Sequence, residues 1–202
     1  MTSIGQTTPA AFGRVRWRRL TFILAPAIFL AGLLVTLTAQ SVLAVSLNIS
    51  GRPFIVTAQV LHGQSFEQFG VFSRSAIHVP GNHRIALAAT AMRSATIRHL
   101  CQAVNVGGVS MIITAGNGRT PVSATNLVVY ADRFSGNASF KQLTLGQDAS
   151  TLHDVPGVQG PAGAFSLHAT RVTISHLRQH AFATIASSFT LPGFRLRFGG
   201  SC

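Results

Sequence analysis

The chain has 202 residues and a formal net charge of +12, with 47% hydrophobic residues and only 10% charged ones. A net positive charge of this size ordinarily suggests a nucleic-acid partner. The arginines beyond residue 19 are spread singly rather than clustered. The N-terminal segment described next also predicts export from the cytoplasm, where nucleic acid is found. We therefore expect no nucleic-acid partner.

The first predicted element is a membrane-spanning helix within residues 20–44. Residues 20–51 contain no charged side chain, and residues 20–39 alone supply the roughly 20 apolar residues that a spanning helix needs. Four arginines come immediately before it: Arg14, Arg16, Arg18 and Arg19. Because such charges stay inside, we expect residues 1–19 to form a basic cytoplasmic tail and the chain after Gln40 to emerge outside.

The same segment has features of a cleavable secretory signal. Val42 and Ala44 occupy the −3 and −1 positions of an A-x-A-like cleavage site. The apolar run is longer than a usual signal core, which favours an uncleaved anchor. We therefore predict a single-pass protein of the cell membrane with its N-terminus inside, or a secreted protein if it is cleaved after Ala44.

Residues 45–202 are predicted to form one extracytoplasmic domain. It is long enough to form a stable hydrophobic core without additional cross-links. It carries twelve basic residues against four acidic ones, a net charge of +8. Attraction to anionic head groups or acidic cell-wall polymers is one interpretation. A basic surface with no specific partner is the other. The acidic residues are Glu67, Asp132, Asp148 and Asp154.

Alternating apolar and polar residues predict strands through this domain. A hairpin is expected from residues 45–50 and 54–61, and only residues 86–93 suggest a short helix. Strands at this spacing predict a mainly β domain that is a sandwich, a jelly roll or a rolled sheet. Further strands are expected over 84–89, 95–100, 109–114, 122–130, 139–145, 169–177 and 189–198. Turns are expected at 107–108, 116–118, 135–137, 156–157, 160–163 and 192–193.

An alanine beside a polar residue, followed by spaced apolar positions, recurs at Ala95, Ala124, Ala138 and Ala169. The uneven spacing is not that of a solenoid. One interpretation is ordinary strand alternation. The other is a stacked or rolled sheet whose small alanines leave room for an apolar interior.

The two cysteines, Cys101 and Cys202, predict a disulfide, since an even pair outside the membrane is ordinarily oxidised. Two buried free thiols are the alternative. A disulfide would place the strand around residues 194–198 beside the strand ending at Cys101.

Several short segments together resemble one family. They are residues 13–20, 67–70, 95–102, 114–116, 121–127 and 138–140, with the near-terminal cysteine. The chain resembles an uncharacterised actinobacterial family of exported or membrane-anchored proteins, sometimes labelled cholesterol esterase. The resemblance implies a Gram-positive cell envelope and carries over no catalytic residue.

A serine hydrolase of the α/β type needs a Gly-x-Ser-x-Gly turn, which this sequence lacks. The nearest string, around Ser65, has no second glycine. The other candidate, Ser150, lies in a glycine- and proline-rich loop that indicates a turn. Its possible partners are Asp148, His153 and Asp154. We predict no catalytic residue.

Histidine spacing offers no metal site. His176 and His180 would share a helical face, but the residues before them form a predicted strand. His99 and Cys101 share a strand face without a carboxylate nearby. No metal and no cofactor is therefore predicted.

These features predict a membrane-tethered, extracytoplasmic β-rich binding or accessory protein of the cell envelope. Its ligand would be a membrane lipid or another apolar envelope molecule, held by apolar side chains with arginines at the rim for head groups. The alternative is an exported lipid or sterol ester hydrolase, as the family label implies.

Overall fold

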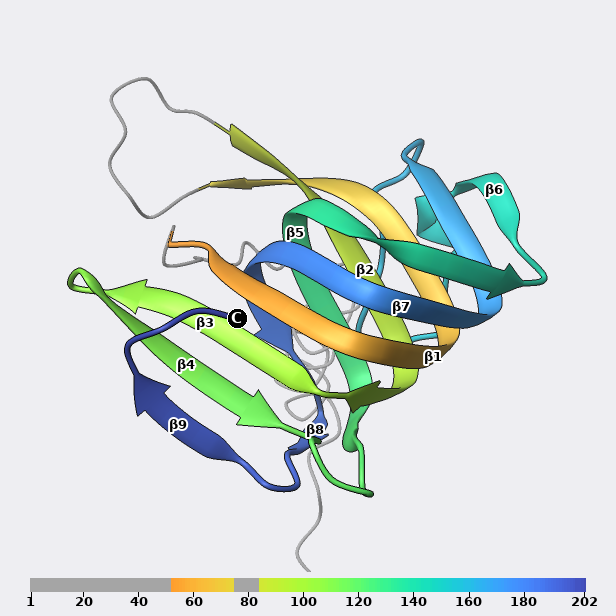
Figure 1. Cartoon of the computed structure of the whole chain (residues 1–202). Helices are drawn as coiled ribbons and strands as arrows, with labels where there is room; N and C mark the ends of the chain where they lie inside the picture. The colour runs from red at the N-terminus through yellow and green to blue at the C-terminus, as the bar shows by residue number, and fades with distance from the viewer. Residues whose placement is uncertain (1–51, 75–83) are drawn as a thin grey trace, which may run out of the picture. The chain divides into compact units, whose positions relative to one another are not determined.

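The computed structural model describes residues 52–74 and 84–202 (Figure 1). The predicted tail with its four arginines, the predicted anchor and the predicted strand over 45–50 lie outside these residues. Within them, no helix has the length and apolar character to span a bilayer. Residues 45–202 form one compact unit with its own hydrophobic core, which is the property of a domain that folds alone.

Antiparallel strands make up most of the described residues, so the mainly β prediction is confirmed. One sheet contains β1 (Phe54–Arg74), β2 (Arg84–Arg98), β3 (Leu100–Val106), β4 (Val109–Ala115), β5 (Val122–Lys141), β6 (Thr144–Asp148), β7 (Phe165–Ile185), β8 (Ser188–Thr190) and β9 (Arg195–Phe198). A short 3-10 turn, η1 (Ala149–Thr151), follows β6.

Four long strands close the sheet into a roll. β1 pairs with β2 on one edge and with β7 on the other, and β5 pairs with both β2 and β7. The order around the roll is therefore β1–β2–β5–β7 and back to β1 (Figure 1). β3, β4 and β9 continue outward from β1 as a three-stranded extension, which we call the flap.

The long strands bend at single residues with a left-handed backbone. Ser65 in β1, Asn126 in β5 and His176 in β7 have φ of 53°, 47° and 53°, and His99 between β2 and β3 has φ of 52°. An irregular residue of this kind bends a strand and increases its twist. Curvature at such points allows the four strands to close on one another.

Small side chains let the roll close tightly. Ala95 lies opposite Ala124 across β2 and β5, and Phe66 lies opposite Ala169 across β1 and β7. All four are buried. Three of the four recurrent alanines therefore belong to the interior, as the rolled-sheet interpretation requires, whereas Ala138 is exposed.

A loop over residues 149–164 covers the outer face of β1, β2 and β5 with a second apolar layer. Leu152 packs with Phe69 and Ala89, and Val155 packs with Ala91. Gly160 allows the loop to fold back on itself, since a Cβ there would lie 2.3 Å from the Cβ of Ala149 and 2.8 Å from its carbonyl oxygen.

Two local predictions are wrong. Residues 86–93 belong to β2 and form no helix. Alanine favours helices, but Ala89 and Ala91 are completely buried beneath the loop, where packing against neighbouring strands decides the conformation. The predicted turn at 135–137 is also strand, because β5 continues to Lys141.

The boundaries of other strands differ as well. No strand was predicted over residues 101–106, which form most of β3. The predicted strand over 189–198 divides into β8 and β9, because Phe194 N donates a hydrogen bond to Leu191 O and turns the chain between them.

Candidate functional site: a basic cleft on β1, β5 and β7

An open cleft of about 760 Å³ lies where β1, β5 and β7 pair with one another. Ligand pockets in proteins commonly span about 300–1,000 Å³. Among the described residues, its lining consists of Ile55, Asp132, Arg133, Phe134, Ser135, Arg178, Gln179 and His180.

The pairing register gathers these residues from distant parts of the chain. Ile55 of β1 and Arg133 of β5 both lie opposite His180 of β7, and Ser135 lies opposite Arg178. Directly opposite residues share one face of a sheet, as do residues two apart on a strand. In the sequence these arginines are spread singly rather than clustered, and no local pattern shows that the strands pair.

Asp132 holds the imidazole of His180. Its Oδ1 lies 2.6 Å from His180 Nδ1, and its Oδ2 lies 3.7 Å from Arg133 Nε. The register of β5 shifts between Ala131 and Arg133, and a shift of this kind redirects a side chain out of regular alternation. The ring of Phe182 also meets that of His180 edge-on, with centroids 5.6 Å apart.

The cleft combines positive charge with apolar surface. Its lining holds two arginines, Arg133 and Arg178, and one carboxylate, that of Asp132, which bonds the imidazole of His180. Guanidinium groups bind carboxylates and phosphates through paired hydrogen bonds. Phe134, whose side chain is 38% exposed, adds an aromatic surface. The arrangement suits an anionic group attached to an apolar body.

The interior of the roll offers much less room than the cleft. Its cavity is about 20 Å³ and borders Phe134 and Gln179, which also border the cleft. Such a volume holds about one water molecule. The Thr184 hydroxyl lines this cavity and has no hydrogen-bond partner among the described residues. An acyl chain does not fit inside, so an apolar ligand would lie in the surface cleft.

A second polar cluster lies beneath the loop over 149–164. Glu67 is completely buried, and its Oε1 accepts a hydrogen bond from Asp154 N at 2.7 Å. Asp154 Oδ2 lies 2.8 Å from His168 Nε2, and Arg93 Nε donates to the Asp154 carbonyl at 2.7 Å. Burial raises the pKa of Glu67. These contacts join the loop to β1, β2 and β7, which is a structural role.

The residues around Ser150, weighed above as a hydrolase site and not predicted to be one, do not meet. Ser150 donates to Asp148 Oδ1 through both its backbone nitrogen and its hydroxyl, each at 2.9 Å. These bonds, with one from Gly163 N, lower the pKa of Asp148 and stabilise the turn predicted there. Asp154 pairs with His168 and not with His153. Across residues 52–74 and 84–202 no hydrogen bond joins a serine to a histidine.

The histidine and cysteine candidates for a metal site have other environments. His176 lies at the bend of β7, which confirms the strand prediction there, and Cys101 is in a disulfide. Within the part of the chain that the structure describes, no group of three or more His, Cys, Asp or Glu side chains is placed to hold a metal ion.

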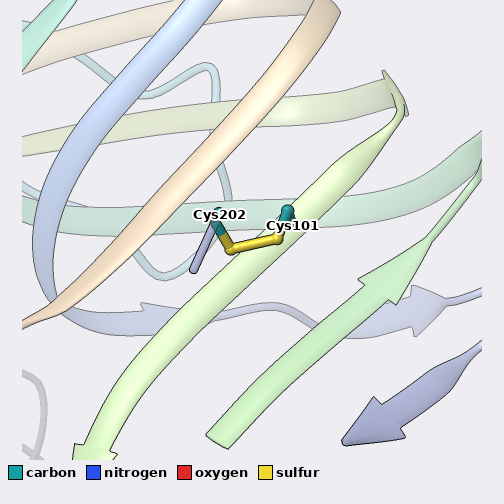
Figure 2. Close-up of a disulfide and its surroundings, with 2 residues drawn as sticks. All are labelled: Cys101 and Cys202. Atoms are coloured by element: carbon teal, nitrogen blue, oxygen red, sulfur yellow. A yellow bond between two sulfur atoms is a disulfide. The ribbon is translucent and has the colours of Figure 1, made fainter. Parts of the chain in front are cut away.

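Cys101 and Cys202 form the predicted disulfide (Figure 2), with Cα atoms 5.7 Å apart. The strand placement that accompanied this prediction is wrong in detail. β9 pairs with β4, so one strand separates it from β3 and Cys101. The chain after β9, residues 199–202, returns across the flap to reach Cys101.

Comparison with known proteins identifies a family but no activity. Residues 50–202 match the model of a family of unknown function (DUF6230). No curated protein and no solved structure matches the chain.

Proposed function

The chain belongs to DUF6230, a family of unknown function, so its function is inferred here from the arrangement of its own residues. We propose that it binds an anionic amphiphile in the cleft on β1, β5 and β7. In this proposal the protein is tethered to an actinobacterial cell membrane by residues 20–44, with the domain outside. It serves there as a binding or accessory protein. The ligand class is a phospholipid or a similar acidic envelope lipid.

The single observation that carries this proposal is the set of charges in the cleft. Two guanidinium groups and one imidazole lie on one face around a single carboxylate. The pair formed by Asp132 and His180 is partly buried, with side chains 27% and 21% exposed. Hydrogen bonds to a charged group strengthen where water is partly excluded. A phosphate would meet both arginines here.

The apolar walls of the cleft support an amphiphile over a simple anion. Ile55 and Phe134 border the same hollow as the charged groups. A phosphate group at the arginines would therefore leave its apolar part against these two side chains. Because the interior cavity holds about one water, we infer that acyl chains lie along the cleft or remain in the bilayer.

Lipid extraction after purification tests the proposal. Residues 45–202 would be produced in the source membrane environment, purified without detergent and analysed by mass spectrometry for bound lipid. We expect an acidic lipid in the wild type, and none in the variant R133A/R178A. A matched control is R119A/R171A, which removes two exposed arginines outside the cleft. A wild-type domain free of lipid, or equal lipid in both variants, contradicts the proposal.

One observation favours a second candidate, the exported lipid or sterol ester hydrolase. Asp132 and His180 have the contact that orients a catalytic histidine in hydrolases, and Ser135 lines the same cleft. Ser135 Oγ instead donates to Arg178 O at 3.1 Å, so a catalytic role would need this side chain to rotate. Cleavage of acyl esters by the wild-type domain that S135A and H180Q abolish would favour this candidate. Activity that survives both changes would remove it.

A further inference from the structure

The flap has one face built from apolar side chains. Cross-strand pairing places Val104 beside Met111, Val106 beside Val109, and Phe198 beside Met111. Opposite residues share a face, and so do residues two apart along a strand. We call this surface the flap face. Its members are Val104, Val106, Val109, Met111, Leu196 and Phe198.

The outer part of the flap face is strongly exposed. Phe198, Val106, Val109 and Leu196 are 66%, 53%, 49% and 46% exposed. Single exposed apolar residues are common, whereas a contiguous group of them marks an interaction surface. This group continues across three neighbouring strands.

The opposite face of the flap is partly covered by the C-terminal residues and carries the charge. Ile112 there is completely buried, and residues 199–202 return over that side to Cys101. Arg195 and Arg197 lie opposite Thr114 and Ile112 on the same side. β9 therefore has arginines on one face and Leu196 and Phe198 on the other. It is amphipathic, and it lies at the edge of the sheet.

The chain enters the domain beside the flap tip. Phe54, the first residue of β1, pairs with Val104, two residues before Val106. The tip itself is a tight two-residue turn at Gly107 and Gly108, whose φ values of 63° and 90° suit a hairpin turn. Ten peptide units join Ala44, the end of the predicted anchor, to Phe54. At full extension they span at most about 35 Å.

We propose that the flap face docks on the outer surface of the bilayer that carries the anchor. Val106, Val109 and Phe198 enter the boundary between head groups and acyl chains. Arg195 extends around the edge strand toward anionic head groups, as long basic side chains do at interfaces, whereas the guanidinium of Arg197 lies beside Gly200 on the opposite face. We assign a bilayer as the binding partner of the flap face because the short segment between Ala44 and Phe54 keeps the flap tip close to the membrane. This inference rests on the tethering part of the proposed function and not on the cleft.

Fluorescence quenching in the full chain tests the docking. Trp17 is the only tryptophan, so W17F gives a silent background for V109W at the tip. The matched control is F165W, at a position that is 62% exposed. It precedes Ser166, which pairs with Phe69 of β1, whereas the flap joins β1 at residues 54–57. The proteins would be reconstituted in phosphatidylcholine and phosphatidylglycerol vesicles with brominated acyl chains. We expect about twofold quenching at position 109, because interfacial residues enter about 5–10 Å, and none at 165.

Alkaline extraction of the same vesicles distinguishes failure of the membrane tether from failure of the flap face to dock. A chain that resists extraction but shows no quenching at position 109, or equal quenching at 165, overturns the docking while the tether stands. A chain released by alkali overturns both. Disulfide cross-links between copies of a V109C variant, without quenching of V109W, also overturn the docking and assign the flap face to self-association.

A second measurement uses exposed side chains whose loss leaves the fold intact. The partition of residues 45–202 onto vesicles of phosphatidylcholine and phosphatidylglycerol would be compared between V106S/F198S and the control F165S. We expect partitioning of the flap variant to fall about tenfold or more, since two apolar side chains lose their burial. Equal partitioning of the two variants overturns the docking.

Discussion

His180 Nδ1 and Asp132 Oδ1 lie 2.6 Å apart although 48 residues separate them in the chain. The contact joins β7 to β5 at the register shift that follows Ala131. It fixes the imidazole at the centre of the basic cleft, opposite Arg133.

This pair should be energetically coupled. Removing one member leaves the other, a partly buried polar group, without its hydrogen bond, and such a loss costs about 1–3 kcal/mol. We therefore expect D132A and H180A each to lower the free energy of unfolding, and the double variant to lower it by less than their sum. Urea denaturation of all four proteins gives the coupling energy. Strictly additive effects would contradict the contact.

The disulfide should dominate the stability of the C-terminal region. It closes a loop with a sequence separation of 101 residues, for which the chain-entropy model gives about 4.7 kcal/mol. C101S, C202S and the double variant should therefore lose the same few kcal/mol, because each removes one and the same bond. Denaturation with and without a reducing agent measures this. Larger destabilisation in the double variant than in either single one would count against it.

Gly160 should be sensitive to the smallest addition. A methyl group there meets the Cβ, carbonyl carbon and carbonyl oxygen of Ala149 at 2.3–2.9 Å, and overpacking of this kind costs about 1–3 kcal/mol. We expect G160A to loosen the loop over 149–164 and to lower the thermal midpoint. G118A is the control, since a Cβ at position 118 meets nothing within 4 Å. Equal midpoints for the two variants would show that the close approach is not essential.

Glu67 should make stability depend on pH in a direction that its burial sets. Burial raises its pKa above the ordinary 4.5, so the native state holds this proton more tightly than the unfolded chain does. The contribution of Glu67 to stability is therefore fully present below pH 4.5 and declines as pH rises through the folded-state pKa. E67Q retains an oxygen for the Asp154 N–H and carries no charge.

The comparison of E67Q with the wild type across pH tests this. Their free energies of unfolding should be similar near pH 4, and E67Q should become the more stable of the two by pH 7. The two proteins differ only at position 67, so the pH dependence of the difference reports the carboxyl group of Glu67 and its electrostatic coupling to its neighbours. A difference that stays constant with pH would contradict the assigned direction.

The features predicted correctly from sequence are those that local chemistry decides. The alternation of apolar and polar residues around Ala95 correctly predicted a strand, because one face of β2 packs into the interior of the roll. The tight turn at Gly107 and Gly108 needs φ values that glycine adopts easily. The disulfide follows from an even pair of cysteines in a domain that the sequence predicts to be exported.

The remaining features depend on contacts between distant residues. Gly136 has the composition of a turn, yet it lies within β5, which pairs with β7 on both sides of it. The close approach of β7 requires glycine there, since a Cβ would come within 2.9 Å of Ile174 Cγ2 and 3.1 Å of the Ser175 carbonyl oxygen. The cleft likewise exists only through the pairing of β5 and β1 with β7. No local pattern at Arg133 or Arg178 specifies that pairing, so sequence reasoning could not find the site.

Titration with a soluble phospholipid tests most directly whether Arg133 and Arg178 bind an acidic amphiphile, as proposed. Dihexanoyl phosphatidylglycerol would be titrated by calorimetry into residues 45–202, first as the wild type, then as R133A/R178A and R119A/R171A. Each charge-assisted hydrogen bond contributes about 1.5–3 kcal/mol, so we expect at least about tenfold weaker binding for R133A/R178A alone. Equal affinity in the two double variants, or no binding by the wild type, would contradict it.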